Sequence, residues 1–133
     1  MILVRCGLGA TRCEIAAAVA AGLEPRTEIV TVSVPARALT AAADLFIIAI
    51  YIPPDSGRIP GDIECLLQTL TSTISTNGLQ GHLLVIGDFN MPCISWHRDG
   101  PVHTSGCNVD VRDTGNRLTE ELRRIEFSRV KTI

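Results

Sequence analysis

The chain has 133 residues, of which 46% are hydrophobic, 20% charged and only 4% aromatic. Such a composition is typical of one folded domain with an aliphatic core, and it excludes a disordered chain. A formal net charge of -2 leaves no basic patch for nucleic acid or for an acidic membrane surface, which argues against a stand-alone DNA-binding domain. An enzyme can still act on a polyanion through one local site.

The sequence carries no signal for a membrane or for secretion. The longest apolar run, Leu45 to Ile52, is much shorter than the roughly 20 residues that a membrane-spanning helix needs. Met1 is followed at once by apolar residues, with no basic region before them, so we expect no signal peptide. The five cysteines form no Cys-x-x-Cys pair, and we expect reduced thiols in an intracellular protein of the cytoplasm or nucleus.

The first third of the chain predicts two strands with a helix between them. Residues Ile2 to Arg5 form a short apolar start, which Gly7 and Gly9 interrupt. A capping box opens an Ala-rich stretch and predicts a helix from about Thr11 to Ala21. The run from Glu28 to Val34 alternates apolar and polar residues, which predicts a half-buried strand.

The rest of the chain predicts two more strands and two helices. Leu45 to Ile52 and His82 to Ile86 are nearly continuous apolar runs, as expected of central strands covered on both faces. Between them, apolar residues from Ile63 to Ile74 repeat at helical spacing. A last helix is expected from Thr114 to about Glu126, after one long loop over Met91 to Asp113. The alternation of strands and helices predicts an α/β fold.

The most informative segment lies at the end of the fourth predicted strand. The strand ends in Gly87, and Asp88 and Asn90 follow two residues apart. Side chains alternate across a strand, so both should project to the same face at its carboxyl end, where α/β sheets collect their active sites. A carboxylate beside a carboxamide suits hard-cation and phosphate chemistry. The alternative is that the two residues only cap a turn after the strand.

Two strand ends carry motifs in a definite order. Tyr51-Ile52-Pro53-Pro54 ends one strand, an amphipathic helix follows, and Gly87-Asp88-Phe89-Asn90 ends the next strand, with Trp96 after it. In content and order the chain resembles the endonuclease/exonuclease/phosphatase family, and it is most similar to the endonuclease domain of non-LTR retrotransposon polyproteins. The similarity runs from Ile2 to about Val130 and is strongest from Leu45 to Trp96.

This resemblance implies a deoxyribonuclease-I-like sandwich of two β-sheets with flanking helices, and a Mg²⁺-dependent phosphodiesterase that nicks DNA. By the same resemblance, Asp88 positions or activates the attacking water or protonates the leaving oxygen. Asn90 would contact the scissile phosphate, and Tyr51 would reach the same phosphate. Analogy with the family also favours a strand, in place of the helix, in the Ala-rich stretch over residues 13–23.

The resemblance covers only part of such a domain. The family's metal-binding Glu would precede the first residue, and its C-terminal Ser-Asp-His would follow the last. None of the three histidines, His82, His97 and His103, matches that His by position. We therefore expect residues 1–133 to form one partial domain, incomplete as a sandwich, with little or no activity of its own and no complete metal site.

Other interpretations stay open. The chain can be a non-catalytic remnant or interaction module of the same fold, or a phosphatase or repair nuclease of the same superfamily. Gly7-Leu8-Gly9 after an apolar run imitates a dinucleotide-binding turn, although Arg12 stands in the place of the third glycine. The spacing of four further residues is compatible with a zinc site, formed by Cys93, His97, His103 and Cys107.

Four prominent side chains also have simple structural interpretations. Tyr51 is an aromatic residue at a strand end, where packing alone is common. Trp96 is expected to anchor its loop in the core rather than to stack on a base. Asp62 is expected to cap the N-terminus of its helix, and Glu64 to be a charge in the first turn, so neither needs a catalytic role.

Overall fold

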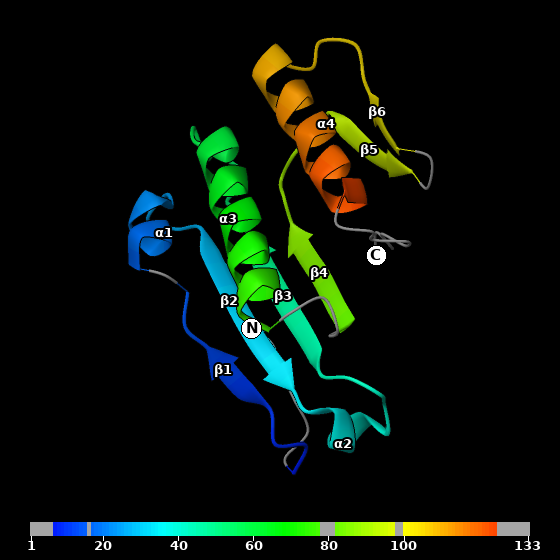
Figure 1. The fold of residues 1–133 in the computed structure, drawn as a ribbon. Coiled ribbons are helices and arrows are strands. Elements are labelled where there is room, and N and C mark those ends of the chain that lie inside the picture. The colour runs from blue at the N-terminus through cyan, green and yellow to red at the C-terminus, as the bar shows by residue number, and fades with distance from the viewer. Residues whose placement is uncertain (1–6, 16, 78–81, 98–99, 125–133) are drawn as a thin grey trace.

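The computed structural model describes residues 7–15, 17–77, 82–97 and 100–124, which form a mixed α/β fold (Figure 1). The elements are β1 (Thr11–Cys13), α1 (Ala17–Gly22), β2 (Glu28–Val34), α2 (Ala36–Leu39), β3 (Leu45–Tyr51), α3 (Ile59–Asn77), β4 (His82–Asp88), β5 (Ile94–His97), β6 (Gly100–His103) and α4 (Val109–Arg124). Figure 1 shows α3 along one face of a four-strand sheet with α1 beside it, and β5, β6 and α4 beyond the end of β4. None of the described helices is long and apolar enough to cross a membrane.

The main sheet has the strand order β1-β2-β3-β4. Its first two pairs are antiparallel, whereas β3 and β4 are parallel and are connected through α3. Parallel neighbours need such a crossover connection, and it brings their carboxyl ends to the same edge of the sheet. The amino end of β2 meets that edge as well, because Glu28 pairs with Tyr51 in register and Tyr51 pairs with Asp88.

The core lies between this sheet and α3. Phe46, Ile48 and Ile50 alternate along β3 and are all buried. Ile48 and Ile50 belong to the same buried cluster as Leu66 and Leu70 of α3, which are fully buried. Each such side chain contributes about 1.5–3 kcal/mol when it leaves water, so the packing of β3 against α3 stabilises this part of the molecule.

Several predicted elements are confirmed, although two strands have a different environment. Strand β2 is not half-buried, because Ile29 and Thr31 are buried on one face and Val32 and Val34 on the other. Strand β2 spans the residues predicted for it, β3 ends one residue early at Tyr51, and the helix predicted around Ile63 to Ile74 is α3. Strand β4 is not a central strand covered on both faces. It is an edge strand of the main sheet among the described residues, as β1 is at the other side, and its Leu84 is 43% exposed.

The helix predicted from Thr11 is wrong in its first half. Residues Thr11–Cys13 form β1, which pairs with Thr31–Ser33 of β2, and α1 begins only at Ala17. Pairing with β2 overrides the local capping signal, because ladder hydrogen bonds to a formed strand satisfy the same backbone groups. Family analogy favours a strand over residues 13–23, but Cys13 is the only described residue of that stretch that lies in a strand. The apolar start at 2–5 lies outside the described residues.

The dinucleotide-binding interpretation of Gly7-Leu8-Gly9 is also wrong. That interpretation requires a glycine turn that opens directly into a helix, so that the helix N-terminus can hold a phosphate. The turn leads instead into the strand β1, and α1 starts well after it. Gly9 has a φ of 67°, which accounts for a glycine at this position without any ligand.

The long loop predicted over Met91 to Asp113 is an ordered hairpin followed by a helix. Strands β5 and β6 pair antiparallel, and α4 begins at Val109, five residues before the predicted start. Asn108 caps that helix, since its side-chain carbonyl accepts the backbone N–H of Asp110 at 2.8 Å. Among the described residues, the β5–β6 sheet packs on α4 and lies beyond the end of β4 rather than over a face of the main sheet (Figure 1).

Candidate functional site

Tyr51 and Asp88, two of the three predicted site residues, lie side by side at one edge of the main sheet. They are the last residues of β3 and β4, and they are register partners in the parallel pair. Neighbouring strands lie about 4.8 Å apart, and paired residues present their side chains on the same face. The backbone N–H of Ile52 donates to the carbonyl of Asp88 at 2.9 Å and ties the two strand ends together.

Asn90 lies beside this pair, but its position does not come from the predicted strand alternation. Strand β4 ends at Asp88, so strand alternation does not place Asn90. Its φ of 45° lies in the left-handed region, which Asn adopts more readily than most other residues with a side chain. The carboxamide nitrogen of Asn90 donates to the carbonyl of Ile52 at 2.5 Å, and its backbone N–H donates to Oδ1 of Asp88 at 3.2 Å.

These contacts form a capped turn and still leave groups for a ligand. A carboxamide has two N–H donors and a carbonyl oxygen, and the bond to Ile52 uses one donor of Asn90. The Asp88 residue is exposed, and the turn uses one of its two carboxylate oxygens. Tyr51 is 44% exposed, so packing alone does not describe this side chain. The turn-capping alternative and a binding role are therefore compatible at this site.

Gly87 and Phe89, the two other residues of Gly87-Asp88-Phe89-Asn90, support the turn through contacts with β3 and with the core. A Cβ on Gly87 would lie 2.7 Å from the carbonyl oxygen of Ile50 and would also meet the Ile50 side chain, so a larger residue does not fit between the paired strands. Phe89 packs against the core, and its ring centroid lies 5.8 Å from that of Trp96 in a tilted arrangement. Trp96 thus anchors this region as expected, although it lies on β5 and not in a loop.

Asp62 organises the loops beside the site, which its sequence position did not reveal. It lies within the first turn of α3 and is not the cap residue, because the helix begins at Ile59. Its carboxylate is 0% exposed and accepts hydrogen bonds from the backbone N–H of Glu24 at 2.9 Å and from the hydroxyls of Thr27 at 2.7 Å and Ser56 at 3.3 Å. A buried carboxylate needs such partners. Asp62 therefore holds the loop before β2 against the loop after β3.

An arginine and several carboxylates surround this sheet edge. Nη1 of Arg26 lies 3.0 Å from both carboxylate oxygens of Asp55, and its Nε lies 3.1 Å from Glu24. The hydrogen bond from Arg26 lowers the pKa of Asp55 below its ordinary value, and the same bond raises the pKa of Arg26. Glu28 pairs with Tyr51 on the face that also carries Asp88. Sequence reasoning missed Arg26 and Glu28, because only the strand register brings them here.

The zinc set is wrong as a metal site. Cys93 and Cys107 form a disulfide, so these two thiols are not reduced as expected, whereas Cys13 and Cys65 are free. The remaining two members lie at opposite ends of the β5–β6 hairpin, because His103 pairs with Ile94 and His97 pairs with Gly100. Within the described ranges no group of three or more His, Cys, Asp or Glu side chains is placed to hold a metal ion.

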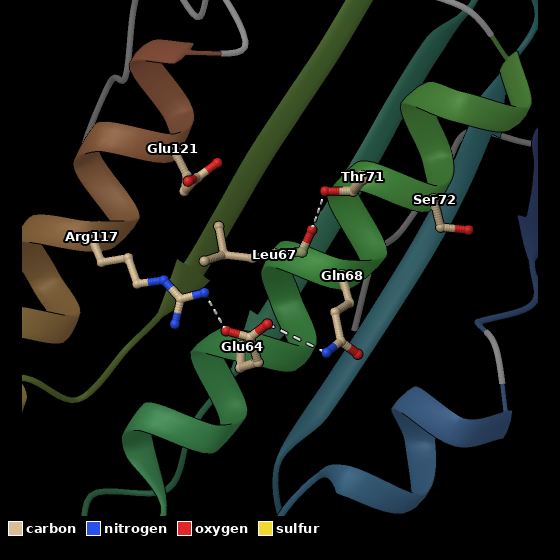
Figure 2. A pocket seen from close by; sticks show the side chains of 7 residues that line it. All are labelled: Glu64, Leu67, Gln68, Thr71, Ser72, Arg117 and Glu121. Carbon is tan, nitrogen blue, oxygen red and sulfur yellow. Dashed lines mark hydrogen bonds and ion pairs between the residues drawn. The ribbon is translucent and has the colours of Figure 1, made fainter.

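A separate groove runs between α3 and α4, away from the candidate residues (Figure 2). It has a volume of about 380 Å³ and is lined by Glu64, Leu67, Gln68, Thr71, Ser72, Arg117 and Glu121. Arg117 reaches across it to Glu64 at 2.6 Å. Glu64, expected to be a simple first-turn charge, therefore links the two helices. Neither Tyr51, Asp88 nor Asn90 lines this groove.

The strand ends and the motifs on them agree with what comparison with protein families finds. The model of the endonuclease–reverse transcriptase family matches residues 45–126, which is more than half of the chain. The chain therefore belongs to the endonuclease–reverse transcriptase family, and the predicted family resemblance is confirmed over that range. The match begins with β3 and includes Tyr51, Asp88 and Asn90. No curated protein and no solved structure matches the chain significantly.

Proposed function

We propose that Tyr51, Asp88 and Asn90 are part of a phosphodiesterase site that nicks DNA, in a domain like the endonuclease of non-LTR retrotransposon polyproteins. Membership of the endonuclease–reverse transcriptase family supports the reaction class. The observation that carries the proposal is the pairing of Tyr51 with Asp88 at the ends of parallel strands, with Asn90 bonded to Ile52 beside them. The hydrogen bonds hold Asp88 and Asn90, and the strand register brings the backbone of Tyr51 beside them, which supports a shared site.

Each of the three residues has a role that its geometry allows. Hydrolysis forms a bond from a water oxygen to phosphorus, breaks one P–O ester bond and transfers a proton from the water to the departing oxygen. The exposed carboxylate of Asp88 orients that water, and the second N–H of Asn90 and the phenol of Tyr51 donate to non-bridging phosphate oxygens. Donors fixed in place ahead of the reaction stabilise developing charge without reorganising, which is a large part of catalysis at phosphate esters.

Mg²⁺ is the ion that the family resemblance implies, and when bound it would neutralise phosphate charge. Magnesium takes oxygen ligands, and Asp88 can supply one. The described residues nevertheless contain no group of three acidic, His or Cys side chains suited to a metal. The described residues therefore do not make a complete magnesium site. We expect this chain alone to nick DNA weakly at most.

The proposed fold is a deoxyribonuclease-I-like sandwich to which the main sheet contributes one layer. The side chains of β4 that point away from α3 support this, because they include Ile86 and the 43% exposed Leu84. An apolar sheet face of this kind normally packs against a second layer.

One other function has a specific observation in its favour, namely a non-catalytic module of the same fold. Asp88 and Asn90 both make hydrogen bonds that cap their own turn. A chain that retained these residues only for the turn would show the same contacts. The two functions differ in whether a phosphodiester binds at the ends of β3 and β4.

Binding is tested with the whole chain and a short DNA duplex in EDTA, followed by amide chemical shifts in NMR spectra. We expect the largest shifts at Tyr51, Asp88 and Asn90, and their loss in Asn90→Ala. A matched control is Asn116→Ala, which removes an exposed carboxamide on α4. Shifts that avoid the β3 and β4 ends, or that survive Asn90→Ala unchanged, would overturn the proposal.

Activity is tested by nicking of supercoiled plasmid in Mg²⁺. We expect at most slow nicking, which Asp88→Ala abolishes and Asp113→Ala, an exposed carboxylate on α4, leaves unchanged. Nicking that persists in Asp88→Ala would place the chemistry elsewhere or in a contaminant. A parallel assay with a phosphomonoester substrate separates the DNA-nicking proposal from a phosphatase of the same superfamily.

A further inference from the structure

We propose that Arg26 contacts the DNA backbone next to the proposed phosphodiester site, and that Asp55 occupies its guanidinium as an exchangeable substitute for a phosphate. This inference rests on the proposed function and adds to it a residue for strand binding. It adds one cationic contact at the site of a chain whose net charge is -2.

Arg26 is close enough to the site to reach the same DNA strand. It precedes Glu28 by two residues, and Glu28 is the register partner of Tyr51. Two residues of chain span at most about 7 Å. Successive phosphates of one DNA strand are separated by about 3.4 Å along the helix axis. Paired strands add about 5 Å between Glu28 and Tyr51, so the backbone of Arg26 lies within about 12 Å of that of Tyr51, which corresponds to about three to four phosphates along the axis.

The contact between Arg26 and Asp55 has the form of a phosphate contact. Nη1 of Arg26 lies 3.0 Å from both Oδ1 and Oδ2 of Asp55, so the guanidinium already binds a two-oxygen anion. Guanidinium groups bind carboxylates and phosphates in closely similar ways. The side chains are 56% and 69% exposed, and exposed ion pairs of this kind are weak. Exchange of Asp55 for a DNA phosphate therefore loses little.

The backbone that carries Arg26 is held in place from both sides. Glu24 donates its backbone N–H to Asp62, and Thr27 donates its hydroxyl to the same buried carboxylate. The N–H of Arg26 itself donates to the side chain of Glu24 at 2.8 Å. Ser56, which follows Asp55, bonds to Asp62 as well. Asp62 thus fixes the loop of Arg26 and the loop of Asp55 relative to each other, so only the guanidinium has to change partner.

The test measures binding of a fluorescent DNA duplex by anisotropy, with the whole chain in EDTA at low salt so that no cleavage occurs. Arg26→Gln should weaken binding several-fold and reduce the slope of log affinity against log salt by about one, the value for one lost phosphate contact. Asp55→Asn should tighten binding several-fold, because it frees the guanidinium. In a chain that already carries Arg26→Gln, the addition of Asp55→Asn should leave the affinity for DNA unchanged, since Asp55 acts through Arg26.

The matched control is the exposed pair Arg112 and Asp113 on α4, 3.5 Å apart. Arg112→Gln and Asp113→Asn change charge in the same way and should leave binding within about twofold of the wild type. Absence of binding by the wild-type chain, an Arg26→Gln effect no larger than that of Arg112→Gln, or no gain in Asp55→Asn would each overturn the inference. Circular dichroism melts check that every variant is folded.

The outcome also separates this inference from the proposed function. If Arg26→Gln weakens binding but the NMR shifts avoid Tyr51 and Asn90, the phosphodiester site is wrong and the placement of Arg26 beside it is wrong too. If Asn90→Ala removes the shifts but Arg26→Gln changes nothing, only the role of Arg26 fails.

Discussion

Replacement of Gly87 by alanine tests whether the turn at the site depends on close contact between β3 and β4. The new Cβ would lie 2.7 Å from the carbonyl oxygen of Ile50, and it would also meet the side chain of that residue. A backbone carbonyl in a paired strand cannot rotate away, so the strands must separate. Overpacking of this kind costs about 1–3 kcal/mol, and we expect Gly87→Ala to reduce the free energy of unfolding by that amount.

Replacement of Gly61 by alanine is a control for which we expect the free energy of unfolding to change in the opposite direction. Gly61 lies in α3, and a Cβ there would meet nothing within 4 Å. Alanine is favoured over glycine in a helix by about 0.5–1 kcal/mol, so Gly61→Ala should stabilise the protein by up to that amount. Urea unfolding followed by circular dichroism measures both variants under identical conditions. A neutral Gly87→Ala, or equal losses in both variants, would refute the reasoning from strand contact.

Three further perturbations follow from the contacts around the site. Asp62→Ala leaves the buried hydroxyl of Thr27 and two half-buried donors without this partner, so we expect a loss of about 3 kcal/mol in urea unfolding, with a smaller loss in Asp62→Asn. At the left-handed Asn90, Asn90→Ala should be less stable than Asn90→Gly by about 1 kcal/mol, and equal stability would argue against this backbone conformation. The pKa of Asp55 is lowered by Arg26, so the stability that this carboxylate contributes is present at neutral pH and is lost as the pH falls through its folded pKa. NMR titration of the Asp55 carboxyl should show a midpoint that rises toward 3.8 in Arg26→Gln, and an unchanged midpoint would contradict the pairing.

Periodicity identified the elements whose pattern is local. The apolar residues of α3 recur at the helical period because this helix buries one face against the core. Strand β2 alternates over the residues predicted for it, and its Val32 and Val34 are buried on the sheet face away from α3. Strand β3 was also recognisable, since its apolar run ends at Ile52, directly before two prolines. The motifs on these elements were sufficient to indicate the family.

Sequence patterns failed where a segment takes its structure from a distant partner. Residues Thr11–Cys13 carry a helix-capping signal, yet they form a strand because β2 offers them a ladder. The Met91 to Asp113 segment is rich in Pro, Gly, Cys and His, and its short strands are stabilised by pairing with each other and by Ile94, which is buried in the core. The strands of four residues are too short to show a period of their own.

The sequence by itself determined which residues the candidate site contains, because Tyr51, Asp88 and Asn90 belong to motifs that can be read along the chain. Only the tertiary structure decided how they meet. The register of β3 against β4 places Tyr51 beside Asp88, and a left-handed turn, not strand alternation, positions Asn90. The surroundings depended on the fold entirely, since Asp62 and Thr27 are 35 positions apart and Arg26 and Asp55 are 29 apart. A hydrogen bond between such distant residues forms only when the sheet and α3 bring their loops together, so no local sequence pattern predicts it.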